Sequence, residues 1–312
     1  MERLDRIEAY RSERGTVLTI GTFDGVHIGH QKIIERVVEV AKKNHLNSCL
    51  LTFSPHPREV LQKDTAIKML STLEEKASRL DLLGLDVLVV HPFSKEFSRL
   101  TAREYVEEVL VKHLKVKHLI VGYDHRFGRN READSVDLHY FAKRFDFEVT
   151  EIEAQDIDDV AVSSTKIRNA LSEGAIHQAN QYLGYTYSLS GIVVKGKGLG
   201  RTLGFPTANI AQIDTKKLLP AHGVYAIRAD LNGTWVNGMM NIGQNPTVAS
   251  DGLHLEVHLF DFEGDLYEKP IVVELHKRLR SEKRFDSLEA LSVQLKEDQL
   301  NTLNYFKKSL LF

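Results

Sequence analysis

The chain has 312 residues, of which 42% are hydrophobic and 27% charged, with 41 lysines and arginines against 43 aspartates and glutamates. This length predicts two domains, and this composition excludes disordered and fibrous proteins. The net charge of -2 excludes the broad basic surface that nucleic-acid-binding proteins need. Cys49 is the single cysteine, which excludes an intramolecular disulfide and a multi-cysteine metal site and favours a reducing compartment.

The hydrophobic residues are spread along the chain. The first twenty residues mix acidic and basic side chains, and nowhere does an apolar run reach the roughly 18 residues of a membrane-spanning helix. We therefore expect a cytoplasmic protein without a secretion signal or a membrane span.

The first predicted domain covers residues 1–183, where short β-branched runs alternate with helical patterns. The expected strands are 17–20, 48–53, 87–91, 118–121 and 148–152. Two helices between them have start signals of the capping-box type, Ser71 with Glu74 and Thr101 with Glu104. This alternation predicts a doubly wound α/β fold, in which ligands lie beyond the carboxyl ends of parallel strands.

The second predicted domain covers residues 184–312, which contain 12 of the 20 glycines. Its short alternating runs are separated by glycine-containing turns and predict strands over 188–194, 223–229, 235–241, 253–260 and 271–276. Such spacing is typical of a closed antiparallel β-barrel. A terminal helix is expected after Asp286, with Glu289 completing a capping box.

The string GTFDGVHIGHQ over 21–31 follows the first strand and leads into a helix. Three glycines let the backbone approach a ligand closely, and the helix terminus presents free N–H groups to an anion: Gly21, Gly25 and Gly29. His27 and His30 have the spacing to donate hydrogen bonds to a pentacovalent α-phosphoryl centre and its leaving pyrophosphate. The alternative is an ordinary glycine turn with surface histidines.

Two further motifs of the first domain carry polar groups. FSPHP over 53–57 follows the second strand. In SSTKIR over 163–168, Ser164 and Thr165 can bind phosphate, and Arg168 can neutralise triphosphate charge. Taken alone, SSTKIR is more often a simple helix N-cap.

The string GIVVKGKGLGRTLGFPTAN over 191–209 lacks the spacing of a Walker A loop or of a dinucleotide-binding loop. It favours a flexible glycine flap over phosphates, followed by a rigid turn at Pro206. In that turn Thr207 and Asn209 offer the oxygen ligands that suit Mg²⁺. Alternatively, these two side chains satisfy the local backbone.

In LEVHLFDF over 255–262, Glu256 projects from one face of a strand and can take a proton from a hydroxyl that attacks a γ-phosphate. The alternative is an exposed strand glutamate without a role. His258, on the same face, is expected to be structural.

These motifs together resemble one known family. The H-x-G-H element over 26–30 is similar to the signature of the doubly wound nucleotidyltransferases, and GTFDGVHIGH resembles the version in prokaryotic bifunctional riboflavin kinase/FAD synthetases. FSPHP and SSTKIR match the same family in order. The 191–209 string, together with PAHGVYA, NIGQNPT and LEVHLFDF, resembles its riboflavin kinase barrel.

The resemblance implies an enzyme that phosphorylates riboflavin to FMN in the barrel and adenylylates FMN to FAD in the first domain, using ATP and Mg²⁺. It implies the catalytic residues Glu256, His27, His30 and Arg168, and the metal ligands Thr207 and Asn209. The implied nucleotide-binding residues are Gly21, Phe23, Asp24, Gly25, Gly29, His56, Asp124, Ser164, Thr165, Gly196, Gly198 and Gly200. No nucleic-acid partner is expected.

One stretch departs from the family pattern G-x-D-F-x-F-G. The chain reads GYDHRFGRNREAD over 122–134, with His125 in place of an aromatic residue and Ala133 in place of a downstream glycine. We expect these changes to alter the flavin and nucleotide pocket without excluding activity. A non-catalytic flavin carrier or regulator, and a different H-x-G-H nucleotidyltransferase, remain as alternatives.

Overall fold

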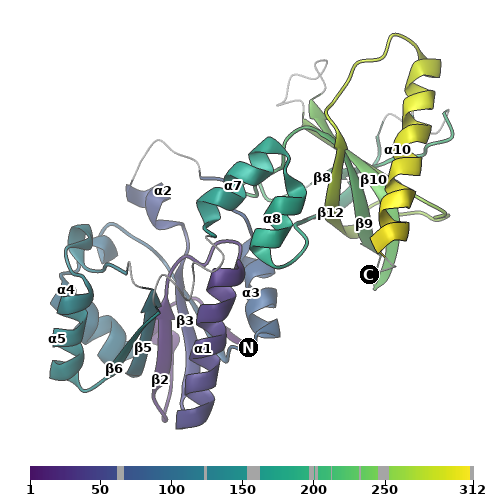
Figure 1. The fold of residues 1–312 in the computed structure, drawn as a ribbon. Coiled ribbons are helices and arrows are strands. Elements are labelled where there is room, and N and C mark those ends of the chain that lie inside the picture. The colour runs from purple at the N-terminus through teal and green to yellow at the C-terminus, as the bar shows by residue number, and fades with distance from the viewer. Residues whose placement is uncertain are drawn as a thin grey trace. The chain divides into compact units, whose positions relative to one another are not determined.

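A computed structural model describes residues 1–61, 67–122, 125–152, 162–196, 200, 203–211, 213–231, 233–244 and 253–309. The chain forms two compact units, Met1–Ser164 and Thr165–Phe312 (Figure 1). Among the described residues, no helix is long and apolar enough to span a bilayer.

The first unit is built on a six-stranded sheet with the order β1-β4-β3-β2-β5-β6, in which all neighbouring pairs are parallel. The strands are β1 (Glu2–Leu4), β2 (Thr16–Ile20), β3 (Asn47–Phe53), β4 (Val87–His91), β5 (Val116–Gly122) and β6 (Glu148–Ile152). Five of them lie where the sequence predicts them, whereas β1, with three residues, is too short to show a periodic pattern. The predicted doubly wound fold is confirmed.

Helices cover both faces of this sheet. The longer ones are α1 (Ile28–Asn44), α3 (Leu73–Leu82), the π-helix η3 (Tyr105–His113) and α5 (Ser135–Phe145). One core joins α1 and α3 to the sheet and includes Ile34 and Leu80, and another joins η3 and α5 to the opposite face and includes Leu110 and Leu138. The short elements are η1 (Ile7–Ala9), α2 (Pro57–Leu61), η2 (Phe97–Arg99), α4 (Ala102–Glu104) and η4 (Arg129–Arg131).

Two predicted helix starts have different outcomes. The capping box of Thr101 and Glu104 is present at the start of α4, which continues directly into η3. The other start signal is wrong by one residue, because Thr72 and Glu75 form the capping box of α3. The Ser71 hydroxyl instead accepts a hydrogen bond from the backbone N–H of Gly25 at 3.1 Å.

The second unit is a closed antiparallel barrel with the strand order β10-β11-β8-β7-β12-β9, as predicted. Its strands are β7 (Ser188–Val194), β8 (Ala208–Ala211), β9 (Gly223–Leu231), β10 (Thr234–Gln244), β11 (Leu253–Leu259) and β12 (Pro270–Arg280). The helices are α7 (Ser164–Glu173), α8 (Ile176–Leu183) and α10 (Leu288–Ser309). The strand β8 corrects one expectation, because the sequence predicts a turn there.

The terminal helix α10 packs on the outside of the barrel. It begins after Ser287, whose hydroxyl accepts from the backbone N–H of Ala290 at 3.1 Å, so the expected pairing of Asp286 with Glu289 is not the cap. Arg280 on β12 pairs with the buried Asp298 of α10 at 2.8 Å. This charged pair fixes α10 against the barrel strands.

Candidate active sites

The loop between β2 and α1 turns sharply at the carboxyl end of the sheet. Gly25 has a φ of 81°, and two non-glycine residues also have positive φ, Phe23 at 45° and Val26 at 37°. A β-branched residue rarely adopts this conformation, so the surrounding contacts must hold it. Strain of this kind is common where a loop is shaped for a ligand.

Asp24 supplies the main anchor of this loop. Its carboxylate is 1% exposed and accepts hydrogen bonds from the backbone N–H groups of Leu70 at 2.9 Å and Ser71 at 3.2 Å. The carboxylate thus holds the loop against the segment that precedes α3. This geometry supports a positioning role for Asp24 beside the predicted phosphate site.

A buried lysine beneath the loop was not predicted from the sequence. Lys76 of α3 is 4% exposed, and its ammonium donates to the carbonyl oxygen of Thr22 at 2.7 Å. Burial lowers the pKa of Lys76, an effect that the nearby Asp24 carboxylate opposes. A lysine on a helix carries no sequence signal that distinguishes it from a surface residue, and only the packing reveals it.

The two histidines of the H-x-G-H element lie face to face. Their ring centroids are 3.6 Å apart and their planes differ by 17°. His27 caps α1 by accepting from the backbone N–H of His30 through Nδ1 at 3.4 Å. Burial lowers the pKa of His27 to about 4. Its ring is therefore neutral at pH 7, with Nδ1 used as acceptor and the proton on Nε2, where it can be donated to a phosphate oxygen.

His30 is also held neutral. Burial, the neighbouring His27 and the Lys76 ammonium lower its pKa well below the ordinary value. Its Nδ1 atom is buried and has no hydrogen-bond partner among the described residues. Phe23 stacks on the other side of the ring, with 4.5 Å between ring centroids. The stack of three rings fixes both imidazoles beside the N-terminus of α1.

The lowered pKa of His27 predicts a pH-dependent stability. An unfolded His27 binds a proton near pH 6.5 and the folded one near pH 4, so stability falls as the pH drops through this window. We expect the neutral His27 to lower the free energy of unfolding by roughly 2 kcal/mol between pH 7 and pH 5. His27→Asn keeps the N-cap acceptor without the titration. Urea unfolding at both pH values should show a smaller loss in the variant, whereas equal losses would contradict the prediction.

The structure places Ser164 at this loop. Its hydroxyl donates to the carbonyl oxygen of Asp24 at 3.1 Å, although 140 residues separate the two in sequence. Gly21 follows β2 and Gly29 lies buried in the first turn of α1. Ser164 ends the first unit, whereas Thr165 and Arg168 continue α7 in the second.

Aromatic side chains line the ends of neighbouring strands. Phe53, at the end of β3, contacts the rings of Phe93 and Phe97, with centroid distances of 5.4 and 5.5 Å. The half-buried His56 follows Phe53, and its Nδ1 accepts from the backbone N–H of Arg58 at 3.1 Å. Apolar rings at this edge are suited to stacking on a planar ligand.

The divergent loop is partly described. Asp124 lies outside the described residues, and His125 is half-buried with its ring 6.0 Å from that of Phe127. Ala133 is 3% exposed and pairs with Phe127 through backbone hydrogen bonds. Ala133 is not among the described residues with positive φ. Its backbone therefore does not require the glycine that the family pattern has at this position.

We expect His125→Phe to change the FMN dependence of FAD formation and to leave riboflavin phosphorylation unchanged. A phenylalanine stacks more apolar surface than a histidine and has no polar group to hydrate or pair when buried. Steady-state kinetics of both half-reactions at saturating Mg-ATP measure the effect. An identical FMN dependence in both proteins would show that His125 does not line the flavin site.

In the barrel, three polar residues lie directly opposite one another on neighbouring strands. Glu256 on β11 pairs in register with Asn209 on β8 and with Asn241 on β10. Directly paired residues of antiparallel strands lie on the same face. The structure thus brings the predicted Glu256 and Asn209 together and adds Asn241, which the sequence could not place without the register.

The predicted glycine flap is close to Asn209. A side chain at Gly196 would overlap the Asn209 amide, and one at Gly200 would overlap the carbonyl oxygen of Phe205. Gly198 lies outside the described residues. Asn209 lies on β8, and Thr207 is the residue immediately before this strand. Both side chains therefore offer oxygen atoms from a backbone that the strand holds in place. The donor set and the close approach of Gly196 fit Mg²⁺ with substrate phosphates.

His258 has a structural contact on the same face. Its Nδ1 lies 2.8 Å from the carbonyl oxygen of Pro206, to which it donates. Its ring also contacts Phe205 and Phe260 edge to face, with centroid distances of 5.2 and 5.6 Å. These contacts hold Pro206, the residue before Thr207, against β11.

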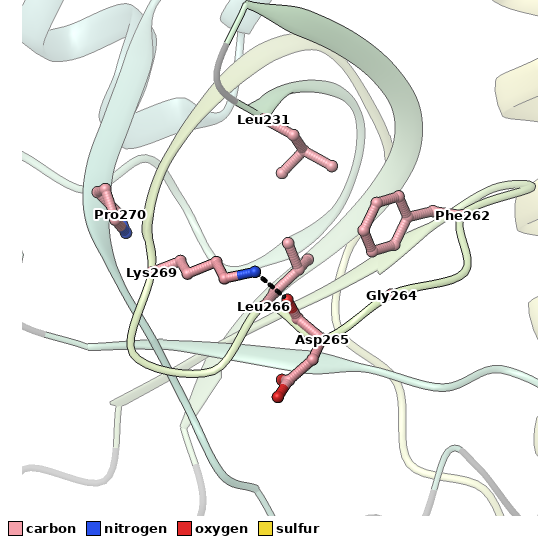
Figure 2. A pocket seen from close by; sticks show the side chains of 7 residues that line it. All are labelled: Leu231, Phe262, Gly264, Asp265, Leu266, Lys269 and Pro270. Carbon is pink, nitrogen blue, oxygen red and sulfur yellow. Dashed lines mark hydrogen bonds between the residues drawn. The ribbon is translucent and has the colours of Figure 1, made fainter.

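A hollow of about 250 Å³ opens between the β9–β10 hairpin and the loop from β11 to β12. Figure 2 shows its apolar walls and the hydrogen bond from the Lys269 ammonium to the carbonyl oxygen of Asp265, which is 2.7 Å long. The residues that line it are Leu231, Phe262, Gly264, Asp265, Leu266, Lys269 and Pro270. The carbonyl oxygen of Lys269 also accepts a hydrogen bond from the backbone N–H of Val193 on β7, the strand that leads to Gly196.

Comparisons with known proteins match a different family to each half of the chain. The FAD synthetase family matches residues 9–166, and the riboflavin kinase family matches residues 183–306. A bifunctional riboflavin kinase/FMN adenylyltransferase of Escherichia coli is 40% identical over 295 residues, 94% of each chain. Its namesake from Listeria monocytogenes is 38% identical over 294 residues, 94% of this chain and 93% of the other.

A crystal structure from Streptococcus pneumoniae has a similar fold over nearly the full length. Its TM-score is 0.88 at 30% identity, and the match covers 97% of this chain and 98% of that one. That protein is described as a macrolide-efflux protein. The likeness shows that both units of the fold occur together in one chain of another protein.

Proposed function

Because this chain belongs to the bifunctional riboflavin kinase/FMN adenylyltransferase family and thus converts riboflavin to FMN and FMN to FAD, we propose which residues perform each step. ATP is the proposed donor in both steps, with Mg²⁺ as its counterion. The observation that carries the proposal is the register that aligns Asn209, Glu256 and Asn241.

In the barrel, the carboxylate of Glu256 takes the proton from the ribityl 5'-hydroxyl of riboflavin. The hydroxyl oxygen bonds to the γ-phosphorus of ATP, the bond from that phosphorus to the β,γ-bridging oxygen breaks, and ADP leaves. Thr207 and Asn209 would hold Mg²⁺, which neutralises charge on the phosphate oxygens when bound. Gly196, Gly198 and Gly200 let the flap approach these phosphates.

The hollow beside the flap is the proposed place of the adenine ring of this ATP. Phe262 and Leu266 offer apolar surface to a planar base, and the backbone of the loop offers polar groups at its edge. The carbonyl oxygen of Lys269 is hydrogen-bonded to Val193 of β7. The hollow and the glycine flap therefore lie at the same end of the barrel.

In the proposed first domain, residues 1–183, an oxygen of the FMN phosphate attacks the α-phosphorus of a second ATP. The bond from that phosphorus to the α,β-bridging oxygen breaks, and pyrophosphate leaves. His27 and His30 donate hydrogen bonds to the phosphate oxygens as charge builds up, and Ser164, Thr165 and Arg168 bind the triphosphate. The anchored Asp24, together with Phe23 and the loop glycines, shapes this site, and His56 and Asp124 contact the nucleotide.

We place the boundary between the two catalytic domains at 183/184. Leu183 ends α8, and Gly184 takes a left-handed φ of 74° that stops the helix. We also place the enzyme in the cytoplasm, because Cys49 is free and buried and burial raises the pKa of its thiol. A reducing compartment suits such a residue.

Incubation of the purified protein with riboflavin and Mg-ATP tests the proposal. Chromatography should show FMN first and FAD later, and chelation of the metal should stop both products. A flavin carrier would return riboflavin unchanged, and a nucleotidyltransferase of another kind would convert neither flavin. The match of riboflavin kinase relatives over both units does not favour either alternative.

A further inference from the structure

A histidine next to the proposed base is hydrogen-bonded to a neighbour of the base. His254 lies two residues before Glu256 on β11, so both side chains are on the same face of the strand. Its Nε2 lies 3.3 Å from Nδ2 of Asn241. Its Nδ1 is buried and has no partner among the described residues. Within the described part of the chain, the imidazole is therefore linked to the site through Asn241.

The backbone leaves room for this contact. Gly243 is the register partner of His254 on β10, two residues after Asn241. The position that a side chain of Gly243 would fill is occupied by the carboxylate of Glu282. Asn241, Glu256 and His254 thus share one face of β10 and β11, with the Glu282 carboxylate beside Gly243.

The hydrogen bond decides which way the Asn241 amide is turned. With Nδ2 as the donor to Nε2 of a neutral imidazole, the Nδ2 side of the amide is engaged with His254. The carbonyl oxygen Oδ1, which cannot donate, is then the amide atom left for the side of Glu256. An amide turned the other way would present N–H groups to the carboxylate and compete with a substrate hydroxyl for it.

From this geometry we infer that His254 is a positioning residue of the kinase reaction, which holds the Asn241 amide nitrogen so that it does not donate to Glu256 and this carboxylate stays free to accept the riboflavin hydroxyl. The inference rests on the proposed role of Glu256. It assigns no direct contact with substrate to His254. Its effect passes through Asn241, and this makes a double-mutant test possible.

His254→Leu removes the acceptor with little change in volume and is expected to lower kcat for riboflavin phosphorylation by roughly 3- to 10-fold, the range of one net hydrogen bond. The KM for ATP should stay unchanged. His254→Gln restores an acceptor near the position of Nε2 and should recover most of the loss. His177→Leu, on the exposed side of α8, is the matched control with wild-type kinetics.

The decisive arm combines His254→Leu with Asn241→Ala. If His254 acts through Asn241, the double variant should be no slower than Asn241→Ala alone. The inference would be overturned if the effects of the two substitutions on kcat multiply, or if His254→Leu has the wild-type kcat. Thermal unfolding of every variant reports on the folding of the barrel, and if His254→Leu does not fold, His254→Ala takes its place in both arms.

Glu256→Gln, measured in parallel, distinguishes a failure of the proposed role of Glu256 from a failure of the proposed role of His254. Full kinase activity in that variant contradicts the proposed function. Loss of activity in Glu256→Gln with no effect of His254→Leu contradicts only the role of His254.

Discussion

Replacement of Glu256 by glutamine is expected to reduce riboflavin phosphorylation by roughly 10²- to 10⁴-fold, the usual contribution of a general base. Glutamine has nearly the same size and still accepts hydrogen bonds, but it cannot take up the hydroxyl proton. Glu256 stands on β11 between the register partners Asn209 and Asn241, so the variant side chain should keep its place. The loss should therefore appear in kcat more than in the KM for riboflavin.

The same variant should still convert supplied FMN to FAD, because that reaction belongs to the first unit. Chromatographic assays of the two half-reactions in one preparation provide this comparison. Glu274→Gln, which replaces another partly exposed glutamate on the barrel strand β12, is the matched control and should leave both rates unchanged. Unchanged phosphorylation in Glu256→Gln would remove this carboxylate from the mechanism.

The parallel sheet could be predicted from the sequence because its strands are buried and bounded by strong helix signals. The predicted ranges of β4 and β6 match the structure at both ends. Helix starts were less certain, since serine and threonine at neighbouring positions give equivalent capping signals. Ser71 and Thr72 are such a pair, and only the tertiary contact of Ser71 with Gly25 shows which residue caps α3.

The candidate kinase site was predicted only in part. The motifs single out Asn209 and Glu256 only together with the family resemblance, and the proximity of the two residues depends on the pairing of β8 with β11 across 47 residues of sequence. The strand β8 has four residues and follows a proline, so its pattern resembles a turn. Asn241 and His254 carry no motif of their own, and register alone brings them to Glu256.

In the first unit, the contacts beneath the H-x-G-H loop escaped prediction for a similar reason. Lys76 and the Asp24 carboxylate are ionic groups on segments far apart in sequence, and their burial follows from the packing of α3 under the loop. Buried charges of this kind need partners to compensate for desolvation. Their presence indicates that the loop conformation is specified by the whole unit.

The adenylyl step provides the second test with a large expected effect. His30→Ala should lower FAD formation by roughly 10²- to 10³-fold, the loss seen when one donor to a developing oxyanion is removed. The ring is held between His27 and Phe23, with centroid distances of 3.6 and 4.5 Å, so its donor is oriented before ATP binds. Because the hydrogen bond strengthens as charge moves onto pyrophosphate, kcat should fall while FMN affinity changes little.

Riboflavin phosphorylation by the same His30→Ala protein should continue at the wild-type rate and so report that the barrel is intact. His139→Ala, a change at an exposed histidine of α5, is the matched control for the first unit. Removal of His30 also opens space beside His27, so thermal unfolding should accompany the kinetics. A folded His30→Ala that retained FAD formation but stopped phosphorylation would reverse the assignment of the two reactions to the two units.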